Sequence, residues 1–162
     1  MTRWLSEDEQ RAWLRLAGVM LKLSPALDSQ LQRDSDLTHF DYLCLAMLSE
    51  TDDRTLPMSD LAQRASASLS RLSHVISKLE NKGWVARTPS PHSRRVTLVN
   101  LTDEGWRVLV EAAPGHVETV RTLVFDGLGP DDVAALERLA GHIVAGIEGS
   151  RLGTTGPDSL SS

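Results

Sequence analysis

The sequence contains one cysteine and no long apolar run, and each shortage excludes a class of protein. Cys44 alone rules out an internal disulfide and any zinc site built on several thiolates. No uninterrupted apolar stretch approaches the ~20 residues that cross a bilayer. The opening residues, MTRWLSEDEQ, are too polar and acidic for a signal peptide. We therefore expect a cytoplasmic protein with no membrane partner.

Patterns that carry catalysis or metal binding are also missing. The sequence shows no nucleophile with a matching base, no glycine-rich loop that cradles phosphate and no paired-carboxylate signature, so we expect neither enzyme activity nor a cofactor. The histidines show no paired ligand spacing on one helix, which argues against a metal site. They are His39, His74, His92, His116 and His142.

What is present suits one compact domain with an added dimerisation element. The chain has 162 residues, of which 41% are hydrophobic and 24% charged. That length leaves little room for two independent cores, and the composition fits a soluble, folded protein.

Charge is unevenly distributed along the chain. The net charge is -5, which by itself argues against binding to nucleic acid. Residues 58–95, however, hold seven basic and only two acidic side chains, a local balance of +5. A concentrated positive segment can meet DNA phosphates while acidic flanks keep the protein soluble. The basic residues are Arg64, Arg71, Lys78, Lys82, Arg87, Arg94 and Arg95.

The first part of the chain predicts two helices. Apolar residues recur at spacings of three and four over residues 6–33, where Ser6 and Glu9 form a plausible capping box. Pro25 is expected to kink or split this helix. A second helix is expected over residues 38–50, capped by Thr38.

Residues 59–83 predict a helix-turn-helix. Two short helical patterns, capped by Ser59 and Ser68, are separated by residues 66–68. The second helix has an apolar stripe, so its opposite face is short, polar and partly cationic, which suits entry into a major groove. A merely solvated face is the alternative. Ser70, His74, Ser77 and Asn81 lie opposite the stripe, Arg71 and Lys78 on one flank and Ser73 on the other.

The next segment predicts a hairpin. Residues 84–87 and 96–101 have strand composition, and we expect residues 88–95, which include two prolines, to form an exposed basic loop. Strand, basic loop and strand together are typical of a wing. Arg94 is placed to reach a minor groove, and Arg95 to bind phosphate or brace the loop.

The last third predicts further helices. One begins at Thr102 and extends toward Phe125, with a bend or break expected at Pro114 and Gly115. A final helix begins near Pro130. Residues 151–162 are expected to form a flexible tail.

This order of elements resembles the MarR family, the multiple-antibiotic-resistance-type regulators, over roughly residues 5–150. The segments that carry the resemblance are LTHFDYLCLAML, MSDLAQRASASLSRLSHVISKLENKGWV and ARTPSPHSRRVTLVNLTDEG. The resemblance implies a mainly α fold, with a winged helix-turn-helix and a small β-hairpin wing in residues 37–113. It also implies dimerisation helices in residues 1–36 and 114–150.

By this resemblance we expect a homodimeric regulator, usually a repressor, that reads an inverted repeat in double-stranded DNA. Its half-sites should lie about one helical turn, ~34 Å, apart. Lys78 and Arg95 are expected to contact phosphates, and Arg94 to enter the minor groove. The expected recognition face consists of Ser68, Ser70, Arg71, Ser73, His74 and Ser77.

The resemblance also raises two questions about particular residues. The family usually has an aspartate before the paired wing arginines, and Ser93 stands there in this chain, which puts the rigidity of the wing in doubt. The family often binds a small aromatic or phenolic acid between the dimerisation helices and the DNA-binding lobe. Residues expected to line such a crevice are Trp13, His39, Tyr42 and Trp106, although ordinary core packing explains them equally well.

Two other functions stay open at this point. The first is a redox or metal sensor acting through Cys44 or the histidines, although a buried core residue is the simpler reading of Cys44. The second is a winged helix used for protein contacts alone, for which a neutral or acidic recognition face is expected. The basic residues of this segment favour DNA.

Overall fold

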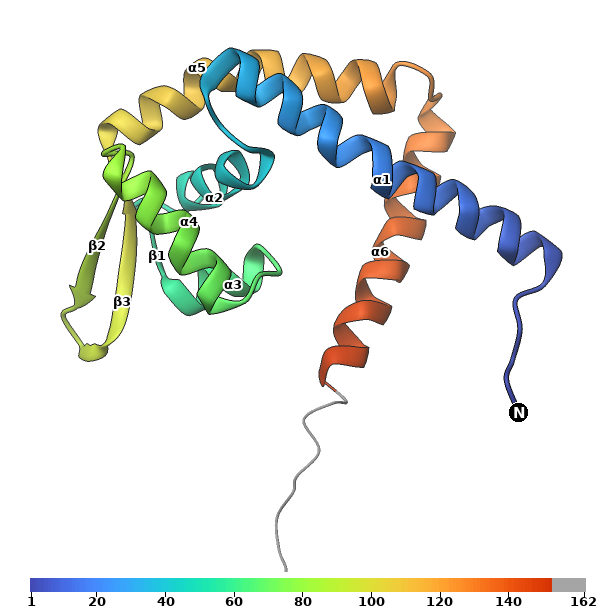
Figure 1. Cartoon of the computed structure of the whole chain (residues 1–162), viewed down its shortest axis with the longest axis horizontal. Helices are drawn as coiled ribbons and strands as arrows, with labels where there is room; N and C mark the ends of the chain where they lie inside the picture. The colour runs from blue at the N-terminus through green and yellow to red at the C-terminus, as the bar shows by residue number, and fades with distance from the viewer. Residues whose placement is uncertain (153–162) are drawn as a thin grey trace, which may run out of the picture. The chain divides into compact units, whose positions relative to one another are not determined.

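The computed structural model describes residues 1–152, which are mainly helical with one small antiparallel sheet (Figure 1). The predicted fold class is therefore confirmed. In chain order the elements are α1 (Glu7–Ser35), α2 (His39–Ser49), β1 (Thr55–Pro57), α3 (Met58–Arg64), α4 (Leu69–Asn81), β2 (Val85–Ser90), β3 (Ser93–Leu101), α5 (Asp103–Val120), the π-helical η1 (Arg121–Phe125) and α6 (Pro130–Leu152).

The chain divides into two compact units. The first spans Met1–Val120, and the second begins at Arg121. The tail expected over residues 151–162 lies, from residue 153 onward, outside the described residues. No helix within residues 1–152 is long and apolar enough to cross a membrane.

The core of the first unit is built mainly from leucine. Fully buried side chains come from the end of α1, from α2, α3, α4 and the sheet, and the first turns of α5 close the cluster. Burying one such side chain contributes ~1.5–3 kcal/mol, so this cluster fixes the positions of α4 and the sheet. The fully buried leucines are Leu31, Leu37, Leu45, Leu48, Leu61, Leu72 and Leu79.

The sheet has the strand order β1-β3-β2, with all pairs antiparallel. The basic loop expected over residues 88–95 is wrong, because β2 pairs with β3 through Pro89 and on to Ser90 opposite Ser93. Only Pro91 and His92 lie between the two strands. Pro89 is tolerated because β2 is an edge strand. An edge strand has a neighbour on one side only, so the N–H that proline lacks is not needed by a second strand. The wing is therefore a paired ribbon almost to its tip.

Neither proline inside a helix splits it. α1 runs through Pro25 and α5 runs through Pro114, so of the predicted alternatives the split and the break are wrong, and the kink and the bend stay predictions. A proline deprives the carbonyl four residues earlier of its helical hydrogen bond. In both helices that residue, Leu21 or Val110, is exposed, so water can satisfy the carbonyl. α5 ends at Val120, and η1 continues to Phe125.

Most helix starts follow the predicted capping chemistry. Ser6 and Glu9 form the expected capping box, and Thr38 forms one with Asp41. Ser68 caps α4 by accepting a hydrogen bond from the amide of Arg71. The predicted cap at Ser59 is wrong. β1 leads directly into α3, so the cap position is Pro57, and no side chain caps this helix.

Gly105 fixes the junction between the sheet and α5. A Cβ at this position would lie 2.0 Å from the carbonyl oxygen of Trp84. The hydroxyl of Thr102 donates to the carbonyl of Gly83 and accepts from the amide of Gly105. The LT-x-x-G sequence therefore joins the base of the wing to α5 through a backbone approach that only glycine permits.

Candidate nucleic-acid interface

α4 has four faces, and each is used differently. The first is the predicted apolar stripe, in which Leu72, Ile76 and Leu79 are fully buried. This burial fixes the rotation of α4 about its own axis. The other three faces follow from that rotation, because successive residues advance by about 100° around the helix.

The second face meets residues 36–41, the turn after α1 together with the first residues of α2, which we call the elbow. The Nζ of Lys78 lies 2.5 Å from Oδ2 of Asp41, a carboxyl side chain that is only 1% exposed. The Nζ of Lys82 lies 2.7 Å from Oδ2 of Asp36. This ammonium lowers the pKa of the Asp36 carboxyl. The elbow therefore holds the last two turns of α4 by ion pairs.

An aromatic contact extends the same face toward the start of α4. The guanidinium carbon of Arg71 lies 4.4 Å from the ring centroid of Phe40, in a cation–π arrangement. The Arg71 side chain was predicted to read bases and Lys78 to contact phosphate. In the structure both side chains contact the elbow, although Arg71 is exposed, and their roles in DNA binding stay predictions.

The third face meets the wing through Arg87 of β2. The guanidinium donates to Oε2 of Glu80 from Nε at 3.0 Å and from Nη2 at 2.7 Å. The backbone amide of Arg87 donates to the other oxygen, Oε1, at 2.9 Å. These bonds lower the pKa of the Glu80 carboxyl. One carboxylate of α4 thus holds both the backbone and the side chain of the wing strand.

The same contact engages Ser77, which was predicted to face DNA. Its hydroxyl donates to the carbonyl of Ser73 and accepts from Nη2 of Arg87 at 3.0 Å. Both serines are half-buried on the side of α4 that faces the wing. The structure therefore places Ser73 and Ser77 between α4 and the wing rather than on the free face.

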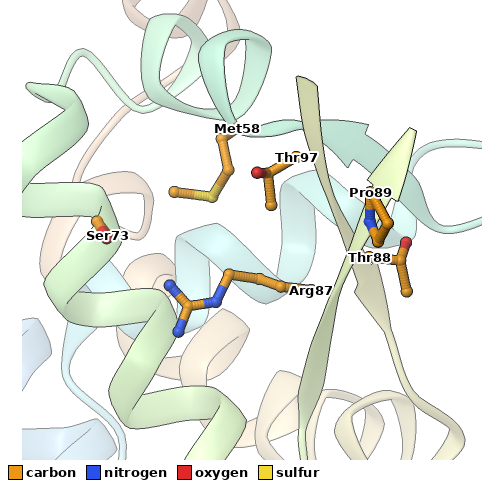
Figure 2. A pocket seen from close by; sticks show the side chains of 6 residues that line it. All are labelled: Met58, Ser73, Arg87, Thr88, Pro89 and Thr97. Carbon is orange, nitrogen blue, oxygen red and sulfur yellow. The ribbon is translucent and has the colours of Figure 1, made fainter. Parts of the chain in front are cut away.

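A hollow of about 440 Å³ lies between α4 and the wing, beside this contact. Figure 2 shows the Arg87 side chain extending from the strand toward the helix that carries Ser73, with Met58 and Thr97 across from it. None of the residues that line the hollow is acidic. They are Met58, Ser73, Arg87, Thr88, Pro89 and Thr97.

The fourth face of α4 is free within the first unit. Ser70 and His74 are exposed there, as the sequence predicted, and Ser68 is exposed at the N-cap position just before the helix. Leu69 is also 57% exposed, and the sequence analysis did not include it. No signal in the sequence indicated this exposure, because helical spacing places Leu69 on the same side of α4 as Leu72 and Ile76, and Leu69 is exposed only because it lies at the start of the helix. The first turn of a recognition helix is the part that contacts base edges, so Leu69 belongs to the candidate reading face.

The wing ends in two exposed arginines, Arg94 and Arg95. Among the described residues, neither forms an ion pair. The hydroxyl of Ser93 accepts from the amide of Arg95 at 3.3 Å, which is a neutral hydrogen bond and not a carboxylate brace. Both cations therefore keep their hydrogen-bond donors available to an anionic partner.

The four predicted effector residues do not come together. His39 and Tyr42 join His116, with ring centroids 5.5 Å and 4.3 Å from that histidine. Trp106 lies under Arg54, 4.4 Å from the guanidinium carbon to the ring centroid. The amide of His39 donates to Asp28, so Asp28 marks where His39 meets α1. Trp13 lies about 22 Å from Asp28 along this helix, at a rise of 1.5 Å per residue. Within one chain the four residues therefore do not line a single crevice, and the effector site stays a prediction.

A second cavity, of about 330 Å³, does include His39. It lies between α1, the start of α2 and α4. Burial lowers the pKa of the His39 imidazole, although Asp28 acts in the opposite direction. The charged and titratable residues that line this cavity are Asp28, His39, Asp41, Arg71 and Lys78.

Cys44 lies in the core and is fully buried. Burial raises the pKa of its thiol to about 12, so the reactive thiolate is disfavoured at neutral pH. Across residues 1–152, no three His, Cys, Asp or Glu side chains are grouped so that they can hold a metal ion. Neither observation supports the redox or metal sensor that the sequence left open.

Comparisons with known proteins place this geometry in context. The sequence profile of the MarR family matches residues 37–97. Sco3205, a MarR family transcriptional regulator from Streptomyces coelicolor solved in complex with DNA, is 40% identical, with a TM-score of 0.87 over 90% of this chain and 91% of that chain. AbsC, another such regulator from the same organism, is 37% identical, with a TM-score of 0.86 over 91% of this chain and 99% of that chain.

A third similar protein is known from its sequence. YfiV, an uncharacterized HTH-type transcriptional regulator from Bacillus subtilis (strain 168), is 29% identical over 82% of this chain and 80% of its own length. The similarity of all three proteins therefore extends well beyond the residues of the helix-turn-helix.

Proposed function

The chain belongs to the MarR family of transcriptional regulators, and we propose that it acts as a homodimeric repressor that binds an inverted repeat in double-stranded DNA. The observation that carries the proposal is a free α4 face in the same unit as two wing arginines that form no ion pair within residues 1–152. A protein that places such a helix in a major groove positions its wing at the adjacent minor groove. The relative Sco3205, solved with DNA, supports this reading.

We assign the contacts by the four faces of α4. Ser68, Leu69, Ser70 and His74 are proposed to approach base edges, because they are exposed at the start of the helix. Arg94 is proposed to enter the minor groove and Arg95 to contact phosphate. Arg71, Ser77 and Lys78 were predicted to join them, and we propose that these three side chains hold α4 in place instead. Ser73, also predicted, lines the hollow between α4 and the wing.

Dimerisation is proposed from apolar surface that the first unit leaves uncovered. Trp13 is 50% exposed and Met20 is 52% exposed on α1. In the second unit, Leu139 and Ile143 of α6 are 50% and 45% exposed. Large apolar side chains left exposed on a helix indicate an interface, and most soluble oligomers are closed and symmetric. We propose that residues 1–36 and 114–150 form the dimer interface, and residues 37–113 the DNA-binding region.

Release by an effector is the regulatory part of the proposal. The cavity beside the elbow combines apolar walls, from Phe40, Leu43 and Val75, with two cations, Arg71 and Lys78, and two carboxylates, Asp28 and Asp41. A small aromatic or phenolic acid suits that mixture, with its ring against the apolar side chains and its anionic group near the cations. Occupation of the cavity would shift α4 relative to the elbow, and DNA affinity would fall if the shifted state binds DNA less well.

The alternatives lack such support. A module for protein contacts alone does not need two unpaired arginines beside an exposed polar helix face, and a thiol sensor needs a thiolate that the burial of Cys44 disfavours. We propose no catalytic activity, in keeping with the family. Because the proposed partner is DNA, we place the action of the protein in the cytoplasm.

Selection from a random double-stranded DNA library tests the proposal directly. The enriched sequence should be an inverted repeat with half-site centres ~34 Å apart, and its affinity should fall steeply with salt concentration. Sedimentation of the protein alone should give the mass of two chains. On DNA that contains one inverted repeat, two chains and not four should bind. Enrichment of no sequence, or a salt-independent affinity, would contradict DNA binding.

A further inference from the structure

We propose that the hollow between α4 and the wing is a binding site for one DNA backbone phosphate, held by Arg87. We call this site the phosphate seat. This inference rests on the proposed DNA-binding function and names a contact within it. Arg87 was counted among the basic residues of the sequence but was given no role there. Its position, its partners and the character of the hollow together carry the inference.

The first argument is the path of the DNA backbone. The major and minor grooves of a duplex are separated by a sugar–phosphate strand. If α4 occupies a major groove and the wing tip the adjacent minor groove, that strand must cross between α4 and the wing. The hollow is lined on these two sides by Ser73 of α4 and by residues 87–89 of β2 and Thr97 of β3, and Met58 of α3 also borders it.

The second argument is the chemistry of the lining. The hollow has one cation and three hydroxyl groups, from Ser73, Thr88 and Thr97, and none of its lining residues carries a carboxylate. Hydroxyl groups and guanidinium N–H groups are the common protein ligands of DNA phosphates. Its volume of about 440 Å³ accommodates a phosphate group together with bridging waters.

The third argument is the way Arg87 is held. Glu80 and Ser77 bind its Nε and Nη2 atoms, and the side chain is only 31% exposed. Within residues 1–152, no hydrogen bond is found for Nη1. A guanidinium fixed on two of its nitrogens presents the third in one orientation, so little entropy is lost when a phosphate oxygen accepts from it. Figure 2 shows this side chain extending into the hollow.

Two variants separate a phosphate seat from a simple brace between wing and helix. Arg87→Gln removes both the cation and the contact with Glu80, whereas Glu80→Gln weakens the contact but keeps the cation. The control is Arg107→Gln on α5, because Arg107 is likewise paired with carboxylates, Glu104 and Glu111, outside the interface. Affinity for one selected DNA site is measured by fluorescence anisotropy between 50 and 200 mM salt.

A phosphate seat predicts a lower salt dependence for Arg87→Gln only. The slope of log K against log salt should fall in magnitude by about 0.9 per bound subunit, so that the affinity loss over this salt range becomes about 3.5-fold smaller per subunit. Glu80→Gln and Arg107→Gln should keep the wild-type slope. Equal slopes for all four proteins, with weaker binding by both Arg87→Gln and Glu80→Gln, would overturn the proposal in favour of a brace.

Methylphosphonate substitution supplies an independent test that changes the DNA rather than the salt concentration. Each phosphate of the selected site is replaced in turn by an uncharged methylphosphonate, and wild type and Arg87→Gln are titrated on each duplex. One position per half-site should weaken wild-type binding and leave Arg87→Gln unaffected. No such position, in a protein that binds the unmodified site normally, would overturn the phosphate seat while leaving the proposed function intact. Failure of wild type to bind any DNA would instead contradict the proposed function itself.

Discussion

Lys78 of α4 and Asp41 of α2 form an ion pair in which Nζ and Oδ2 are 2.5 Å apart, although the carboxyl is 1% exposed and the ammonium 41% exposed. Oδ2 of Asp41 also accepts from the amide of Thr38, and no partner is found for the buried Oδ1 within the described residues. A buried carboxylate with so few ligands depends on its cation. Lys78 therefore links the DNA-binding helix to the elbow that ends α1.

Replacing Lys78 by methionine should destabilise the protein without changing its phosphate contacts. The apolar stem is kept, but a buried carboxylate loses its cation, at a cost of about 1–3 kcal/mol. Urea unfolding should show this loss. The slope of log K against log salt should stay at the wild-type value, because no phosphate contact disappears. A reduced slope with unchanged stability would return Lys78 to the role that the sequence suggested.

Replacing Gly105 by alanine should destabilise the first unit. The added Cβ would meet the carbonyl oxygen of Trp84 at 2.0 Å, so the backbone at the base of the wing must move. Overpacking of this kind costs at least ~1–3 kcal/mol. Thermal unfolding measures the loss. Gly127→Ala is the control, because the Cβ of the new alanine would meet nothing within 4 Å. The free energy of unfolding of this variant should differ from that of wild type by less than ~0.5 kcal/mol.

Stability should fall as the pH drops below about 6.5, the ordinary pKa of histidine. Burial lowers the pKa of both His39 and His116 in the folded protein, and the nearby His39 lowers that of His116 further. As the pH falls, the unfolded chain therefore binds protons at a higher pH than the folded protein does. The contribution of these histidines to the free energy of unfolding is complete above their ordinary pKa and is lost as the pH falls.

Unfolding midpoints in urea, measured from pH 8 to pH 5, check this prediction. The variant His116→Gln should lose less stability across the same range than wild type, because one of the two buried imidazoles is gone. Parallel profiles for the two proteins would show that His116 does not contribute to the pH dependence.

Leu69 should recognise a thymine methyl group. It is exposed at the first residue of α4, and apolar side chains in a major groove contact that methyl. Burial of one such carbon contributes about 0.8 kcal/mol, or roughly 4-fold in affinity. Replacing each thymine of the selected site by uracil should therefore reveal a position that weakens wild-type binding about 4-fold. The Leu69→Ala variant should not distinguish the two bases there.

Local sequence patterns predicted much of this architecture. The spacing of Leu72, Ile76 and Leu79 identified the buried side of α4, and the hydroxyl groups of Ser6, Thr38 and Ser68 marked three helix starts. These signals succeed because periodicity and capping depend on residues three or four positions apart. The exposure of Arg94 and Arg95 followed from the hairpin pattern in the same way.

The partners of the remaining α4 residues could not be read from local patterns. Lys78 meets a carboxylate 37 positions earlier, and Lys82 meets one 46 positions earlier. Periodicity shows which residues avoid the core, but it does not show what covers them. The same limit explains the effector prediction, because Trp13 and His39 were grouped by residue type although α1 keeps them far apart. The wing was predicted too open, since Pro89 lies on an edge strand.

The central claim is that the free face of α4 and the wing arginines bind DNA together. The most direct test is a comparison of wild type, His74→Ala, Arg94→Ala and Arg107→Ala on the selected inverted repeat and on a scrambled duplex at one salt concentration. The account predicts that His74→Ala and Arg94→Ala lose most of the preference for the repeat, while Arg107→Ala matches wild type. Retention of full preference by both interface variants would contradict it.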